Sequence, residues 1–132
     1  MSWVTLSTTD VRDNLNDAEF EEYRRHVGPD QADPMTSILA DVTAEVRGYV
    51  STEHEISGKV GVPQSLKNAA IDIAIYRLAK RCHMGSEQQR KPAADAAVEL
   101  LQRVAEGDHG IDDVTVEPTN SGASWGSGDK II

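Results

Sequence analysis

The sequence predicts a mainly α-helical fold: a small antiparallel bundle of four or five helices followed by an extended C-terminal tail. Three observations favour this class. Apolar residues recur at spacings of three and four in several stretches before Gly107. Helix start and stop residues separate these stretches by short connections, which favour antiparallel neighbours. After Gly107, a good residue for ending a helix, glycine and serine cluster between Ser121 and Gly128. The chain therefore divides into a helical domain, residues 1–107, and a tail, residues 108–132.

Two short helices are expected near the N-terminus. The hydroxyl residues from Ser7 to Thr9 offer N-cap side chains for the first, because a side-chain oxygen there accepts a hydrogen bond from a free backbone N–H of the first turn. Asn16 or Asp17 can cap the second helix in the same way. The Gly28-Pro29 pair should end it, since glycine accepts a left-handed cap and proline cannot continue a helix.

A third, longer helix has the sharpest start signal in the chain. Asp33 suits the N-cap, and Pro34 suits the first helical position, where its missing N–H costs nothing. Spacings of three and four then place one apolar stripe on this helix, whose predicted core residues are Ile38, Leu39, Val42 and Val46. Such a stripe requires a packing partner.

The fourth helix is predicted to be the buried centre of the bundle. A polar loop over residues 51–62 precedes Val62-Pro63, which opens the most apolar stretch of the chain. Apolar residues cover most faces of this helix, and its predicted core residues are Leu66, Ile73 and Leu78. Cys82, the only cysteine, is interpreted as a buried small hydrophobe rather than a reactive thiol. Met84-Gly85 should end the helix.

A last helix is expected before the tail. Ser86 and Gln89 have the spacing of a capping box at its start. Pro92 either kinks this helix or marks its true start. The apolar stripe that follows contains the predicted core residues Leu101 and Val104.

The tail holds a few side chains suited to a partner. Residues 111–117 alternate like a β-strand. Trp125 stands alone among small residues, which suits an anchor that fills a pocket elsewhere. The predicted partner-binding residues are Trp125, Lys130, Ile131 and Ile132. An exposed tail with an incidental tryptophan is the alternative that the sequence leaves open.

The charge distribution argues against a protein that grips nucleic acid. The chain carries 22 acidic and 13 basic residues, for a net charge of −9. Only residues 61–84 are net basic, and phosphate binding needs a concentrated positive face. The acidic cluster of Glu19, Glu21 and Glu22 is interpreted as a solvated face. No apolar run approaches the roughly 18 residues of a membrane span, and no signal-peptide pattern is present, so we expect a soluble protein made in the cytoplasm.

No residue pattern predicts catalysis or the binding of a metal or another cofactor. Glu53, His54 and Glu55 resemble a ligand cluster but lack the HExxH spacing, and a glycine-containing loop does not hold zinc geometry. Cys82 and His83 are adjacent, so their side chains diverge by about 100° on a helix and cannot form a nucleophile–base pair. No nucleophile-elbow, dinucleotide or phosphate-loop motif occurs. We expect a protein that is not an enzyme and uses no cofactor.

Two blocks of sequence resemble a known family. The first is VPQSL over residues 62–66 with AIDIAIYRL over residues 70–78, and the second is DAAVELL over residues 95–101 leading to VAEG over residues 104–107. Both resemble the small head–tail adaptor, or head-completion, proteins of Mu-like and related tailed phages. The resemblance covers about residues 3–107, and Pro92 and Ala94 depart from the family's usual last helix.

The resemblance implies a structural role in the virion. Such adaptors are helical bundles that form a ring, commonly a dodecamer, at the head–tail interface. The implied partners are further copies of the chain, the portal protein, and a tail-side neck or stopper protein. DNA would pass through the channel without sequence-specific binding, and no membrane is involved. An acidic channel wall would repel the duplex and let it slide.

A second class of function fits the same composition. A cytoplasmic helical binding module, such as a regulator or an antitoxin-like protein, would also be acidic, because an acidic protein can neutralise a basic partner. Neighbouring genes for a portal, a capsid and a tail would favour the adaptor. A neighbouring gene for a basic toxin would favour the binding module.

Overall fold

The computed structural model describes residues 3–27, 33–108 and 110–111. Over these residues the chain is mainly helical, which confirms the predicted fold class. In chain order the elements are β1 (Trp3–Val4), α1 (Thr8–Arg12), α2 (Asp17–Arg25), α3 (Pro34–Ser51), β2 (Val62–Pro63), the short 3-10 helix η1 (Gln64–Leu66), α4 (Lys67–Arg81) and α5 (Glu87–Ala105).

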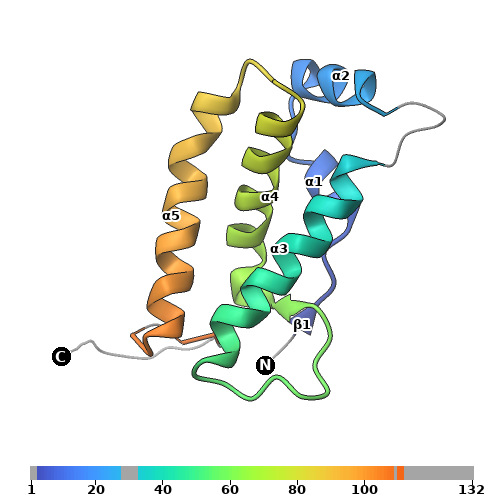
Figure 1. The fold of residues 1–132 in the computed structure, drawn as a ribbon. Coiled ribbons are helices and arrows are strands. Elements are labelled where there is room, and N and C mark those ends of the chain that lie inside the picture. Colours follow the sequence, from blue (N-terminus) through green and yellow to red (C-terminus); the bar gives the residue numbers. More distant parts are fainter. Residues whose placement is uncertain (1–2, 28–32, 109, 112–132) are drawn as a thin grey trace.

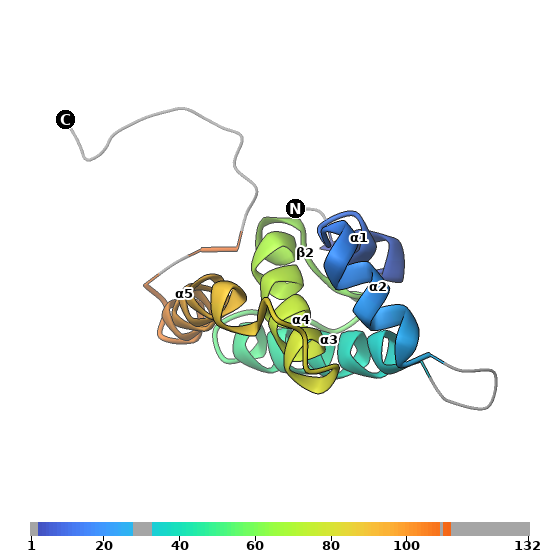
Figure 2. The ribbon, with the colours of Figure 1, turned by 90° about the horizontal axis from the view of Figure 1, so that it is seen from above.

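The central element of the bundle is α4. It packs against both α5 and α3, which also contact each other, while α1 and α2 add a further layer beside α3 and α4 (Figures 1 and 2). Buried residues occur on every turn of α4, and four of them are alanines, which let neighbouring helices approach closely. In the described part of the chain, no helix combines the length and apolar character that crossing a bilayer requires.

The residues predicted for the core lie together in one buried cluster. They are Ile38, Leu39, Val42, Val46, Leu66, Ile73, Leu78, Leu101 and Val104. Ile111, which follows α5, belongs to the same cluster, and its carbonyl oxygen accepts a hydrogen bond from Ser65 Oγ at 2.6 Å. This contact fastens the chain after α5 to the segment that leads into α4.

The predicted N-caps of the first three helices are confirmed. Ser7 and Asn16 each form a capping box, with Asp10 and Glu19 as the reciprocal side chains. The Asp33 side chain accepts a hydrogen bond from Met35 N, and Pro34 is the first residue of α3. The stop predicted for α2 at Gly28-Pro29 lies outside the described residues.

The predicted start of the fourth helix is wrong. Val62 and Pro63 do not open a helix; they pair as β2 with β1 in antiparallel register, Val4 opposite Val62 and Trp3 opposite Pro63. Only after η1 does α4 begin, at Lys67. The physical reason is a pairing with residues almost sixty positions away, which no local pattern contains.

Two further helix termini differ from the predictions. The helix α4 ends at Arg81, before Met84-Gly85, because His83 adopts a positive φ of 53° that a helix cannot contain. The capping box predicted at Ser86 is absent, because the Ser86 hydroxyl donates to Glu19 instead of capping α5. Pro92 lies inside α5 and does not mark its start. Gly107 has a φ of +83°, as expected for the residue that ends this helix.

Candidate interaction surface

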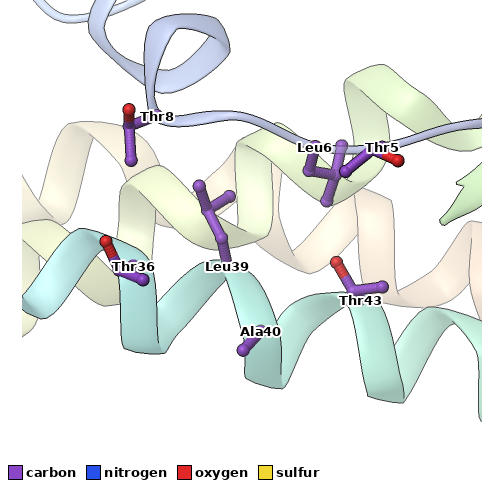
Figure 3. A pocket seen from close by; sticks show the side chains of 7 residues that line it. All are labelled: Thr5, Leu6, Thr8, Thr36, Leu39, Ala40 and Thr43. Carbon is purple, nitrogen blue, oxygen red and sulfur yellow. The ribbon is translucent and has the colours of Figure 1, made fainter.

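A shallow groove runs between the N-terminal segment and α3. Its volume is about 440 Å³, and it is lined by Thr5, Leu6, Thr8, Thr36, Leu39, Ala40 and Thr43 (Figure 3). We call it the threonine groove. The two leucines reach toward each other from opposite walls and form an apolar floor, and the threonines stand around it (Figure 3).

Both walls of the threonine groove are held by local interactions. On α3, Thr36, Ala40 and Thr43 share one face because they recur at spacings of four and three, beside the buried core stripe. The opposite wall is the extended segment between β1 and α1. It is fixed at one end by the pairing of β1 with β2 and at the other by the capping box of Ser7.

The chemistry of the threonine groove is uncharged. None of its seven lining residues is ionisable. Leu6 and Leu39 are buried, whereas Thr5, Thr36 and Ala40 are exposed. Within the described residues, the hydroxyl groups of the four threonines make no hydrogen bond, so they can donate to or accept from a bound segment. The surface suits an uncharged stretch of chain that inserts an apolar side chain.

A second cluster lies between α2 and the start of α5, and it corrects one prediction. Glu19 was expected on a solvated face, but its exposed fraction is 1%. Its carboxylate accepts hydrogen bonds from Arg90 Nε at 2.9 Å, from Arg90 Nη2 at 2.6 Å and from the Ser86 hydroxyl. Arg90 also donates to the carbonyl oxygen of Asn14 at 2.8 Å. Glu21, by contrast, is exposed, in an ion pair with Arg24.

The electrostatics of Glu19 follow from these contacts. The Arg90 hydrogen bonds lower the pKa of Glu19 to about 2, against the opposing effect of burial. The charge is thus held in the folded protein and compensated on both oxygens. Because the partners are all intramolecular, we interpret this cluster as a structural link between α2 and α5 rather than a binding site.

Two of the four basic residues in the net basic stretch over residues 61–84 are paired with carboxylates of neighbouring helices. Lys67 pairs with Asp10 of α1 at 3.3 Å, and Arg77 pairs with Glu45 of α3 through two hydrogen bonds. The Arg77 contact lowers the pKa of Glu45. These two pairs reduce the positive charge that this stretch presents.

Cys82 and the Glu53–Glu55 cluster were also singled out in the sequence, and the structure places both. Cys82 is buried, as predicted, and burial raises the pKa of its thiol. Over residues 3–27, 33–108 and 110–111, no group of three or more His, Cys, Asp or Glu side chains is placed to hold a metal ion, the Glu53–Glu55 cluster included.

The predicted partner-binding residues lie outside the described residues. They are Trp125, Lys130, Ile131 and Ile132. Most of the predicted strand over residues 111–117 lies outside as well, and only Ile111 is placed. Sequence reasoning in turn missed the threonine groove. The signal was the recurrence of small residues beside the core stripe of α3, but the opposite wall comes from a segment thirty residues earlier.

The sequence of the chain matches one phage protein family. The sequence pattern of the family described as Bacteriophage Mu, Gp36 matches residues 6–126, which is most of the chain. The chain belongs to this family. It is therefore a phage protein, as the Mu-like part of the resemblance implied. The Gp36 match continues past the expected limit at residue 107 and includes Trp125, so the family pattern is not confined to the helical bundle. No curated protein and no solved structure matches the chain.

Proposed function

We propose that this Gp36-family protein is a structural head–tail adaptor. In this proposal it forms a ring between the portal and the tail neck of the virion, extends the DNA channel and seals the connector. The observation that carries the proposal is the family match over residues 6–126, because it makes the chain a phage protein. The helical bundle with a tail agrees with the architecture that the adaptor resemblance implies.

The distribution of charge supports a passive role toward DNA. The net charge is −9, and Lys67, Arg77 and Arg90 are each paired with a carboxylate of another helix. A ring built from such subunits presents acidic surface to the duplex, which repels phosphates and allows sliding. Its partners would be further copies of the chain, the portal protein and a tail-side neck or stopper protein. The proposal assigns the chain no catalytic role.

The first experiment measures mass by light scattering after size exclusion, for the purified full chain alone and mixed with the portal protein of the same genome. Co-elution in one large defined complex supports the adaptor, even where the free chain is a monomer. A monomer or dimer that never binds the portal contradicts the proposed contact. That outcome favours the acidic protein-binding module, whose partner would then be sought among basic host or phage proteins.

A further inference from the structure

We propose that the threonine groove of one copy receives residues 119–128 of a neighbouring copy, with Trp125 as the inserted side chain. This inference rests on the proposed ring, because it names the contact that joins adjacent copies. It commits to one occupant, a segment of a second copy of this chain.

The match of chemistry is the first argument. The groove is lined by seven uncharged residues, with an apolar floor and four threonine hydroxyls that make no hydrogen bond within the described residues. The segment TNSGASWGSG over residues 119–128 is likewise uncharged, and Trp125 is its only large apolar side chain. Its serine, threonine and asparagine side chains and its backbone N–H and C=O groups complement the hydroxyl rim. An indole fits a groove of about 440 Å³, and its N–H can donate to a threonine hydroxyl.

The uncharged character of this segment distinguishes it from the rest of the tail. Residues 112–117 carry three carboxylates, and Asp129 and Lys130 carry opposite charges. Burying a charge against the apolar floor of the groove would be costly without a partner. Within the tail, residues 119–128 are thus the stretch that the groove can accept.

The length of the tail allows it to leave its own subunit. Ile111 is fixed by Ser65 and by burial in the core. The 14 residues from Ile111 to Trp125 (125 − 111) span at most about 46 Å when extended. For comparison, the 18 residues of α3 are about 27 Å long. The anchor can therefore reach beyond the domain that carries it.

The positions of the tail and of the groove favour a ring. In Figures 1 and 2, α5 lies on one side of α4 and α1 on the other, while α3 packs against both α4 and α5. The last described residue, Ile111, is bonded to Ser65 just before α4, while the groove lies between α3 and the N-terminal segment, so the start of the tail and the groove are different surfaces. A contact between two different surfaces is heterologous, and a heterologous contact closes into a ring when its rotation permits.

The test uses the full chain and two matched pairs of variants. Ala40→Lys places a charge in the groove, and Ala44→Lys places the same charge on an exposed alanine one turn further along α3, outside the groove. Trp125→Ala removes the anchor, and Ser124→Ala changes its neighbour. Mass is measured by light scattering after size exclusion, with and without the portal protein.

We expect the wild type and the two control variants to assemble equally. Ala40→Lys and Trp125→Ala should each weaken association roughly thirtyfold or more, as loss of a central interface anchor does. Mixing these two variants should restore one contact, because the intact tail of Ala40→Lys can enter the intact groove of Trp125→Ala. The mixture should therefore give a one-to-one pair that neither variant forms alone.

Three results would overturn the inference. Equal assembly of Ala40→Lys and Ala44→Lys would show that the groove is not the contact, while portal binding by the wild type would leave the adaptor proposal standing. Failure of the mixture to pair would show that the tail of one copy does not enter the groove of another. A wild-type chain that stays monomeric with and without the portal protein would contradict both proposals.

Discussion

Glu19 joins two parts of the bundle that are far apart in the chain. Its carboxylate completes the capping box of α2 and also accepts hydrogen bonds from Ser86 and Arg90 at the start of α5. Both oxygens have partners, which offsets the cost of burying the charge. A glutamine at this position keeps one acceptor oxygen and replaces the other with an NH2 group, so part of the hydrogen bonding from Arg90, Ser86 and Asn16 N is lost.

We therefore expect Glu19→Gln to lower the free energy of unfolding by roughly 2–4 kcal/mol. Urea denaturation followed by circular dichroism measures this change. Glu21→Gln is the matched control on the same helix, because Glu21 is exposed and its ion pair with Arg24 is a surface one. It should change stability by no more than about 0.5 kcal/mol. Equal effects of the two substitutions would contradict the structural link.

The contribution of Glu19 to stability should depend on pH. The pKa of Glu19 is about 2 in the folded protein, against 4.5 for an unperturbed glutamate, so its contribution is present above pH 4.5 and is lost as the pH falls toward 2. The lowered pKa of Glu45 acts in the same direction, while burial raises the pKa of Asp72 and opposes it. The stability difference between wild type and Glu19→Gln should narrow by roughly half between pH 7 and pH 3. A constant difference in urea denaturation across this range would be the contrary result.

Gly61 is a second position where one residue decides local structure. Its φ is +82°, and a Cβ there would lie 2.0 Å from the carbonyl oxygen of Val4. Its own carbonyl oxygen accepts a hydrogen bond from Arg47 at 3.0 Å. The loop before β2 is thus packed directly against β1.

Gly61→Ala should destabilise the protein by several kcal/mol, because it combines backbone strain with a collision against main chain that cannot yield. Gly58→Ala is the matched control: its φ is +78°, but no atom lies within 4 Å of the added Cβ, so the cost should be about 1 kcal/mol. The thermal midpoints of the two variants compare these costs directly. A smaller loss for Gly61→Ala than for Gly58→Ala would mean that β1 does not pack here.

At the scale of elements, the periodicity of apolar residues predicts the interiors of the helices, but it does not always predict where a helix begins or ends. Apolar residues recur on each turn of α3 and α4, so one misassigned position does not change the prediction of a helix. The ends depend on single contacts. Val62 and Pro63 are extended because they meet β1, and Ser86 is drawn away from α5 by Glu19.

The central position of α4 is tested by Ile73→Asp. Ile73 is 5% exposed, and an unpaired carboxylate there should unfold the domain or cost several kcal/mol. Asn68→Asp is the control, since Asn68 is exposed in the first turn of the same helix, where a negative charge is favourable. Circular dichroism of both variants measures whether each keeps its helical signal. A soluble, fully helical Ile73→Asp protein would contradict the assigned core.

At the scale of the whole molecule, we predict that the bundle provides stability and that the tail provides assembly contacts. The described core ends with Ile111, and the family match continues to residue 126. Residues 119–132 lie outside the described residues, within which the buried cluster runs from Leu6 to Ile111.

Deleting residues 119–132 should therefore leave the helical signal and the thermal midpoint nearly unchanged and impair assembly with the portal and with other copies. Deleting only residues 127–132 is the control that keeps Trp125 and removes the Ile131-Ile132 end. If assembly survives the shorter deletion and not the longer one, the tryptophan segment is the active part. Loss of helical signal on the longer deletion would instead make the tail part of the fold.

The sequence by itself determined the helical class, the N-cap at Asp33 and the apolar stripes that form the core, and it confined the first two N-caps to residues 7–9 and to Asn16 or Asp17. These features depend on residues a few positions apart, so a local pattern contains them. The tertiary structure alone decided the β1–β2 pairing, the burial of Glu19 and the threonine groove. Each of these brings together segments about thirty to seventy residues apart. The local sequence around Glu19 predicts a solvated side chain, because it does not contain the helix that supplies Arg90.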